Sequence, residues 1–206
     1  MDKYLVELIG TFFLVLTIGL AGGLGHAGEM APLAVGGVLM AMIFAGGHVS
    51  AAHYNPAITL AFWMRGRCKS SDVAGYIVGQ VLGTALAALA VGALAGEASP
   101  APASFETVPL LVVEVIFTFG LCWVILNVAT ARGTEGNGFY GLAIGIFVIG
   151  GAYTVGPISG AVFNPAVALG LCMMEIVPWT LLGAYVVTEV LGVVLAGLAF
   201  RWLVRE

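Results

Sequence analysis

The chain has 206 residues, of which 61% are hydrophobic and 9% are charged, with a formal net charge of −4 and a mean hydropathy of +1.08. A soluble domain of this length cannot bury so much apolar surface, so the composition indicates a protein that is solvated by lipid. The few charges form no basic face, which excludes nucleic acid as an expected partner.

Apolar runs along the chain predict where it crosses the membrane. A spanning helix needs about 20 apolar residues, and six stretches reach that length, at about residues 3–25, 32–50, 72–95, 108–130, 138–156 and 179–203. Two further runs, 55–64 and 164–174, have about half that length. Each follows a turn-prone stretch of small residues. The first stretch contains Gly46-Gly47 and Ser50-Ala51-Ala52, and the second contains Gly156-Pro157 and Ser159-Gly160-Ala161. We interpret both short runs as re-entrant half-helices, so the prediction is a single all-α membrane domain over residues 1–206.

Basic residues predict the orientation, because short cytoplasmic loops are enriched in Lys and Arg. All of them fall on one side of the predicted membrane: Lys3, Arg65, Arg67, Lys69, Arg132, Arg201 and Arg205. The opposite loops carry acidic residues: Glu29, Glu97, Glu106 and Glu175. This sorting predicts a multi-pass protein of the cell membrane with both termini in the cytoplasm.

The chain contains an internal repeat, about residues 1–97 and 107–206, and its best match sets residues 53–57 against residues 162–166. Each half holds three predicted spans, an odd number, so the two halves must have opposite orientations in the membrane. This is an inverted 3+3 arrangement. The two half-helices then enter from opposite faces and meet near the midplane.

Both half-helices begin with the same three residues, Asn55, Pro56 and Ala57 in one half and Asn164, Pro165 and Ala166 in the other. Asn is a favoured N-cap and Pro a favoured first helical residue. The cap uses the side-chain oxygen, so we expect the amide NH₂ groups of Asn55 and Asn164 to donate into a pore. Two donors at the positive ends of two helices favour an oxygen lone pair and oppose a cation. One copy alone would indicate an ordinary turn, whereas two equivalent copies indicate a pore.

Backbone that is not helical is tolerated at membrane depth only where protein covers it or a wet cavity solvates it. The approaches to the two motifs are therefore expected to line the pore with carbonyl groups. These belong to Ala51, Ala52 and His53 in the first half and to Gly160, Ala161 and Val162 in the second. The His53 side chain is also expected to face the pore, whereas His48 is interpreted as structural.

Three acidic residues, Glu7, Glu114 and Glu189, lie within predicted spans, where ionisable groups are costly and usually functional or paired. We expect Glu7 and Glu114 to accept hydrogen bonds from the backbone of the re-entrant loops, with a proton relay as the alternative. Glu189 occupies the place that Gln80 has in the first half. It is either protonated or paired with a group that the sequence does not identify.

Catalytic and metal chemistry find no support in the sequence. The three cysteines, Cys68, Cys122 and Cys172, have no paired spacing, so neither a disulfide nor a metal site is predicted. The sequence has no pairing of nucleophile with base and no cofactor motif, so we expect neither an enzyme nor a cofactor.

Together these features resemble the aquaporin, or major intrinsic protein, family over essentially the whole chain. The resemblance rests on the twin Asn-Pro-Ala motifs, the Glu7 and Glu114 pair, residues 47–53 and Gln80. It implies a homotetramer in which each subunit has its own pore for water. In some branches the pore also passes glycerol, urea, ammonia or metalloid hydroxides such as arsenious and boric acid.

One position departs from the family pattern. In the family an Arg usually follows the second Asn-Pro-Ala motif and forms part of a narrow selectivity filter, but this chain has Val167 there. By the family's spacing the other filter positions are Val35, Ala152 and Ala161, and water-selective relatives place an aromatic residue and a His at the first two. The resemblance therefore implies an uncharged, apolar and wider filter, suited to water and to uncharged solutes as large as glycerol, urea or arsenious acid. Without the Arg, the exclusion of protons would depend on the two helix ends.

Two other interpretations stay open at this stage. One is an ion-conducting or gated variant of the same family. The other, with less support, is a coupled secondary transporter, because such proteins also use inverted repeats and broken helices.

Overall fold

The computed structural model describes residues 1–95 and 102–204. Within these ranges six long helical segments are apolar and long enough to cross a membrane. They contain α1 (Asp2–Thr17), which continues as a π-helix (Ile18–Gly23), α2 (Ala31–Ser50), α4 (Ser70–Ala95), α5 (Thr107–Thr130), α6 (Tyr140–Ser159) and α8 (Leu182–Leu203). Short 3-10 turns occupy Gly28–Met30, Arg132–Thr134 and Trp179–Leu181. The predicted spans are confirmed, with ends that differ by a few residues.

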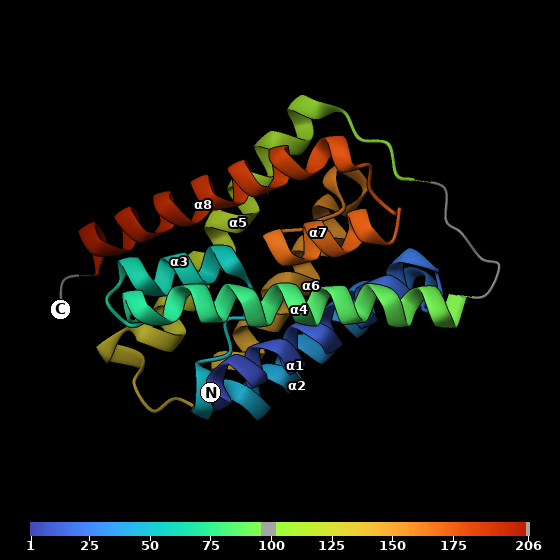
Figure 1. Ribbon diagram of the computed structural model, residues 1–206. Helices are drawn as coiled ribbons and strands as arrows, with labels where there is room; N and C mark the ends of the chain where they lie inside the picture. Colours follow the sequence, from blue (N-terminus) through green and yellow to red (C-terminus); the bar gives the residue numbers. More distant parts are fainter. Residues whose placement is uncertain (96–101, 205–206) are drawn as a thin grey trace.

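The two half-length runs form α3 (Pro56–Met64) and α7 (Pro165–Met173). In Figure 1 these two helices follow one another along the molecule between α4 and α8. Helix α1 packs on α4 and α5 packs on α8, while α2 and α6 join the two halves. The prediction of six spans with two half-helices is therefore confirmed.

Only the second part of each turn-prone stretch forms a turn. The prediction is correct for Ala51-Ala52 and Gly160-Ala161 and wrong for Gly46-Gly47 and Gly156-Pro157, which lie in helices. Gly46 lies inside α2, where a Cβ atom would stand 2.0 Å from the hydroxyl oxygen of Tyr54, so this glycine makes room for a ring. Pro157 lies inside α6, which continues to Ser159. A proline in a helix removes one backbone hydrogen bond, and prolines are more frequent in membrane helices than in soluble ones. The actual turns are confined to residues 51–55 and 160–164.

Close contact between helices occurs at equivalent glycines of the two halves. A Cβ atom on Gly83 of α4 would stand 2.3 Å from the carbonyl oxygen of Leu8 in α1. A Cβ atom on Gly192 of α8 would stand 2.9 Å from the carbonyl oxygen of Val115 in α5. Lipid is as apolar as the helix surfaces, so the hydrophobic effect does not drive these helices together. Small residues that allow close backbone packing stabilise such pairs instead.

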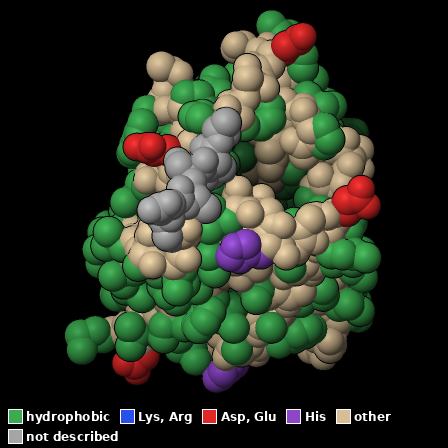
Figure 2. All heavy atoms as spheres, turned by 90° about the vertical axis from the view of Figure 1, so that its right-hand side faces the viewer, with side chains coloured by type: hydrophobic (Ala, Val, Ile, Leu, Met, Phe, Trp, Pro, Cys, Tyr) green, Lys and Arg blue, Asp and Glu red, His purple; other side chains and the backbone are tan. Residues whose placement is uncertain are grey.

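Basic side chains gather at one end of the molecule. Lys3 Nζ lies 2.7 Å from Asp72 Oδ2, which joins the first turns of α1 and α4. The Arg67 side chain donates to the carbonyl oxygen of Thr130 at the end of α5 (3.2 Å). On the face in Figure 2, at the opposite end, acidic and histidine side chains are visible, and no Lys or Arg of the described residues appears. The sorting of charge matches the sequence pattern, although Glu97 and Arg205 lie outside the described residues.

Candidate pore and its selectivity region

The two re-entrant turns have the same backbone conformation, residue by residue. Asn55 has φ −158° and ψ 119°, and Asn164 has φ −158° and ψ 113°. The residues before them adopt left-handed φ values in matching pairs: Ala51 (65°) with Gly160 (84°), Ala52 (51°) with Ala161 (52°), and Tyr54 (48°) with Phe163 (52°). Left-handed conformations are unfavourable for residues other than glycine. Both turns must therefore be held in place by other contacts.

Each asparagine caps its own half-helix, as the sequence predicts. Asn55 Oδ1 accepts from the backbone N–H of Ala57 (2.9 Å), and Asn164 Oδ1 accepts from that of Ala166 (2.9 Å). These bonds satisfy N–H groups that a helix start leaves without partners. The positive ends of α3 and α7 therefore lie at the two asparagines.

Each asparagine amide already uses one of its two N–H groups within the protein, which corrects the prediction in part. Asn55 Nδ2 donates to the carbonyl oxygen of Phe163, and Asn164 Nδ2 donates to that of Tyr54, each over 2.9 Å. One N–H of each amide thus connects the two turns, because the carbonyl groups of buried loop residues need donors. The second N–H of each amide is left for the cavity that both asparagines line.

Two buried carboxylates hold the turns. Glu7 accepts from the backbone N–H groups of His53 (2.9 Å) and Tyr54 (2.7 Å) and from the hydroxyl of Ser50 (2.7 Å). Glu114 makes the three equivalent bonds, with Val162 (3.0 Å), Phe163 (2.8 Å) and Ser159 (2.6 Å). Both glutamates are fully buried. The hydrogen bonds that the sequence led us to expect from these two residues are present.

Two tyrosines that we did not predict complete the support. The hydroxyl of Tyr76 donates to the carbonyl oxygen of Ser50 (2.8 Å), and that of Tyr185 donates to the carbonyl oxygen of Ser159 (2.6 Å). They could have been found from the repeat, because Tyr76 and Tyr185 have the same separation in sequence as Ser50 and Ser159.

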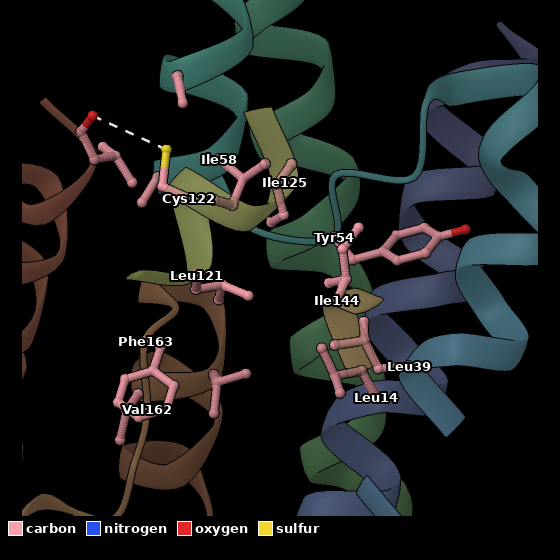
Figure 3. Packing of buried hydrophobic residues seen from close by; sticks show 14 of the residues in the cluster. Leu14, Leu39, Tyr54, Ile58, Leu121, Cys122, Ile125, Ile144, Val162 and Phe163 are labelled. Carbon is pink, nitrogen blue, oxygen red and sulfur yellow. Dashed lines mark hydrogen bonds between the residues drawn. The ribbon is translucent and has the colours of Figure 1, made fainter. Parts of the chain in front are cut away.

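A narrow cavity of about 70 Å³ adjoins both turns. Aliphatic side chains from the long helices make up much of its wall: Leu14, Ile18, Leu39, Ile43, Leu121, Ile125, Ile144 and Val148. In Figure 3, Leu14, Leu39 and Ile144 gather on one side, and Leu121 and Ile125 lie on the other. The wall is apolar, and its polar atoms come mainly from the two turns and their asparagines.

Three of the four predicted filter residues, Val35, Ala161 and Val167, line this cavity, and Val167 is 4% exposed. Ala152 does not line it. That residue lies one helical turn beyond Val148, on the same face of α6. Of the residues whose carbonyl groups are expected to line the pore, Ala51, Ala52, His53, Ala161 and Val162 lie along this cavity. Gly160 does not, because it ends α6 as an exposed C-cap.

The two histidines before the first half-helix have different surroundings. His53 lies along the cavity, and its ring packs between the rings of Phe62 (centroids 4.2 Å apart) and Tyr76 (4.7 Å). His48, which we interpreted as structural, is exposed at a wider opening of about 460 Å³ that Arg67 and Arg132 also line. This opening shares wall residues with the narrow cavity, so the cavity continues toward the basic end of the molecule.

Residues 1–200 match the family described as Major intrinsic protein. The chain belongs to the major intrinsic protein, or aquaporin, family. It is 34% identical to aquaporin NIP1-1 of Zea mays, over 97% of this chain and 74% of the relative. It is 32% identical to aquaporin AqpM of Methanothermobacter thermautotrophicus, over 99% of this chain and 98% of the relative.

The fold agrees with this assignment. The X-ray structure of the aquaglyceroporin from Plasmodium falciparum superposes with a TM-score of 0.84, covering 98% of this chain and 95% of that one, at 19% sequence identity. As a member of the aquaporin family, the protein is a membrane channel for water and small solutes and not an enzyme.

Proposed function

We propose that this channel passes water together with uncharged solutes of the size of glycerol, urea or metalloid hydroxides such as arsenious acid. The proposal rests on the position of Val167. It stands in the cavity wall three residues after Asn164, where the family pattern leads one to expect an arginine. With Val35 and Ala161, it gives this part of the wall no charge and no side-chain donor.

Selectivity in such channels follows from pore diameter, from the donors and acceptors in the wall, and from electrostatic barriers. A wall of valine and alanine leaves room that an arginine side chain would fill, and it contacts the carbon skeleton of a solute. The remaining N–H groups of Asn55 and Asn164 offer donors to hydroxyl or carbonyl oxygens. Behind them the positive ends of α3 and α7 oppose cations. A neutral solute with both apolar and oxygen-bearing parts suits this combination.

The buried acids favour a passive channel over a coupled transporter. A transporter that uses protons or sodium needs an ion site whose ligands change between two states. Glu7 and Glu114 instead hold strained turns through three or more hydrogen bonds each. An ion-conducting variant is the second candidate, because Val167 removes a positive charge that the family uses against cations.

We also propose that the protein is a homotetramer in the cell membrane with both termini in the cytoplasm. The tetramer follows from the family resemblance. The orientation follows from the basic residues at one end of the molecule, such as Lys3 and Arg67, since cytoplasmic loops are the basic ones.

The proposal can be tested with the purified protein in liposomes, by stopped-flow light scattering under gradients of an impermeant sugar, of glycerol and of urea. Wild type is expected to pass water and at least one of the two solutes faster than empty vesicles. Val167→Arg should suppress the solute flux, and Val167→Leu, which adds bulk without charge, separates the effect of charge from that of size.

A trapped pH-sensitive dye in the same vesicles measures proton leakage. Proton flux with little solute flux would favour the ion-conducting candidate. Water and solute fluxes equal to those of empty vesicles would overturn the proposal.

A further inference from the structure

The two halves of the pore support differ at one pair of positions. In the first half, Gln80 Nε2 donates to Glu7 Oε2 (2.8 Å) and to Thr59 Oγ1 (3.0 Å). In the second half, the residue at the position of Gln80 is Glu189, and Glu114 corresponds to Glu7. An amide that donates to a carboxylate in one half is thus replaced by a second carboxyl group in the other.

Glu189 is fully buried, and only one of its oxygens has a hydrogen-bond partner. Its Oε1 accepts from the backbone N–H of Asn164 (2.9 Å), whereas Oε2 has none. The preceding N–H, that of Phe163, donates to Glu114. Glu114 and Glu189 therefore bind consecutive N–H groups of the same turn, and both are fully buried in a site that water does not reach.

Two ionised carboxylates in such a site would be very unfavourable without a cation. Helices α3, α5 and α7 pack against α8, and none of the three contains Lys, Arg or His. Glu114 already accepts three hydrogen bonds, which stabilise its ionised form, while Glu189 accepts one. A proton shared by the pair therefore resides on Glu189.

We propose that Glu189 is a proton-binding residue that, as a neutral carboxylic acid, donates from Oε2 to Glu114 and so reproduces the bond between Gln80 and Glu7. The position of Thr59 is taken by Ala168 in the second half, so the hydroxyl that serves as second acceptor for Gln80 has no counterpart there. Glu189 is then a positioning residue: its Oε1 holds the N–H of Asn164 at the cap of α7, and its proton removes the repulsion that two charged carboxylates would create beside this turn.

We expect the Glu189 carboxyl group to lose its proton only under alkaline conditions, because no cation faces it from the described helices that pack against α8. From α5 the facing titratable group is Glu114, and from α8 it is Tyr185, whose hydroxyl donates to Ser159. From α7 the nearest is Cys172, whose thiol donates to Pro178, and α3 contributes no titratable side chain. Deprotonation of Glu189 would place two negative charges beside Asn164, so the second turn is expected to loosen at high pH. The first turn, where the Gln80 amide takes the place of the second carboxyl group, has no such dependence.

Infrared spectroscopy tests the protonation without reference to transport. At neutral pH the difference spectrum between wild type and Glu189→Gln is expected to show the C=O stretch of a protonated carboxylic acid, present only in wild type. The mirror variant Gln80→Glu should add a second such band, because it builds the same pair in the first half. A wild-type spectrum with no protonated carboxyl band that depends on Glu189 would overturn the proposal.

The effect on flux rests on the proposed channel function and is measured separately. In liposomes, Glu189→Gln should keep the wild-type flux at neutral pH and abolish the loss of flux at alkaline pH, whereas Glu189→Leu should lose flux at both. An alkaline loss that persists in Glu189→Gln would overturn the positioning role. A carboxylic acid band in a protein that passes neither water nor solute would overturn the proposed function and leave the protonation of Glu189 standing.

Discussion

Glu7 makes four hydrogen bonds, so Glu7→Gln measures how strongly the first turn is held. Oε1 accepts from Ser50 and His53, and Oε2 accepts from Tyr54 and Gln80. Glutamine keeps one acceptor oxygen and puts an NH₂ group in place of the other. The N–H of Tyr54 and the amide of Gln80 would then face a donor.

The loss can be worked out from these bonds. A hydrogen bond to a charged group contributes about 1.5–3 kcal/mol. Losing two of them therefore lowers the free energy of unfolding by about 3–6 kcal/mol. Gln80 Oε1 has no partner in the structure, so a rotation of that amide could recover one bond and roughly halve the loss.

Thermal unfolding of the purified protein, followed by tryptophan fluorescence, measures this change. For a chain of this size about 1 kcal/mol corresponds to about 2–4 °C in the midpoint. Glu7→Gln is thus expected to lower the midpoint by about 6 °C or more if the Gln80 amide does not rotate. The matched control is Glu29→Gln, at an exposed residue whose side chain has no such role. Equal midpoints for the two variants would refute the view that Glu7 holds the turn.

Two further results are expected. Gly83→Ala should lower stability by about 1–3 kcal/mol, since its Cβ would clash with the Leu8 carbonyl oxygen 2.3 Å away. Gly92→Ala on the same helix meets no atom within 4 Å, so equal effects of the two changes in thermal unfolding would contradict this contact. Burial and the nearby Asp72 charge raise the pKa of the Cys68 thiol, so labelling by a membrane-impermeant maleimide should be slow at neutral pH and accelerate as pH rises. Cys68 should react in inside-out vesicles and not in intact cells, with Cys68→Ser as control, and labelling of intact cells would reverse the proposed orientation.

Features that depend on the order of residues along one segment could be predicted from the sequence. The length of an apolar run sets whether it can cross the bilayer, and Asn-Pro at the start of a run sets where a half-helix begins. Both properties are local, so the six spans and the starts of α3 and α7 were predicted correctly. The repeat also predicts that Glu7 and Glu114 are equivalent, because residues at matching positions of the two halves make the same hydrogen bonds.

Other features depended on contacts between segments far apart in the chain. The asparagine amides connect the two turns through bonds between residues 108 and 110 positions apart, which no local pattern indicates. The glycine at position 46 resembles a turn signal, but it lies within α2, and the Tyr54 ring packed against it explains why no side chain fits there. Sequence alone also left the state of Glu189 open, because the cost of its charge depends on which groups surround it. Those surroundings exist only once the two halves have packed together.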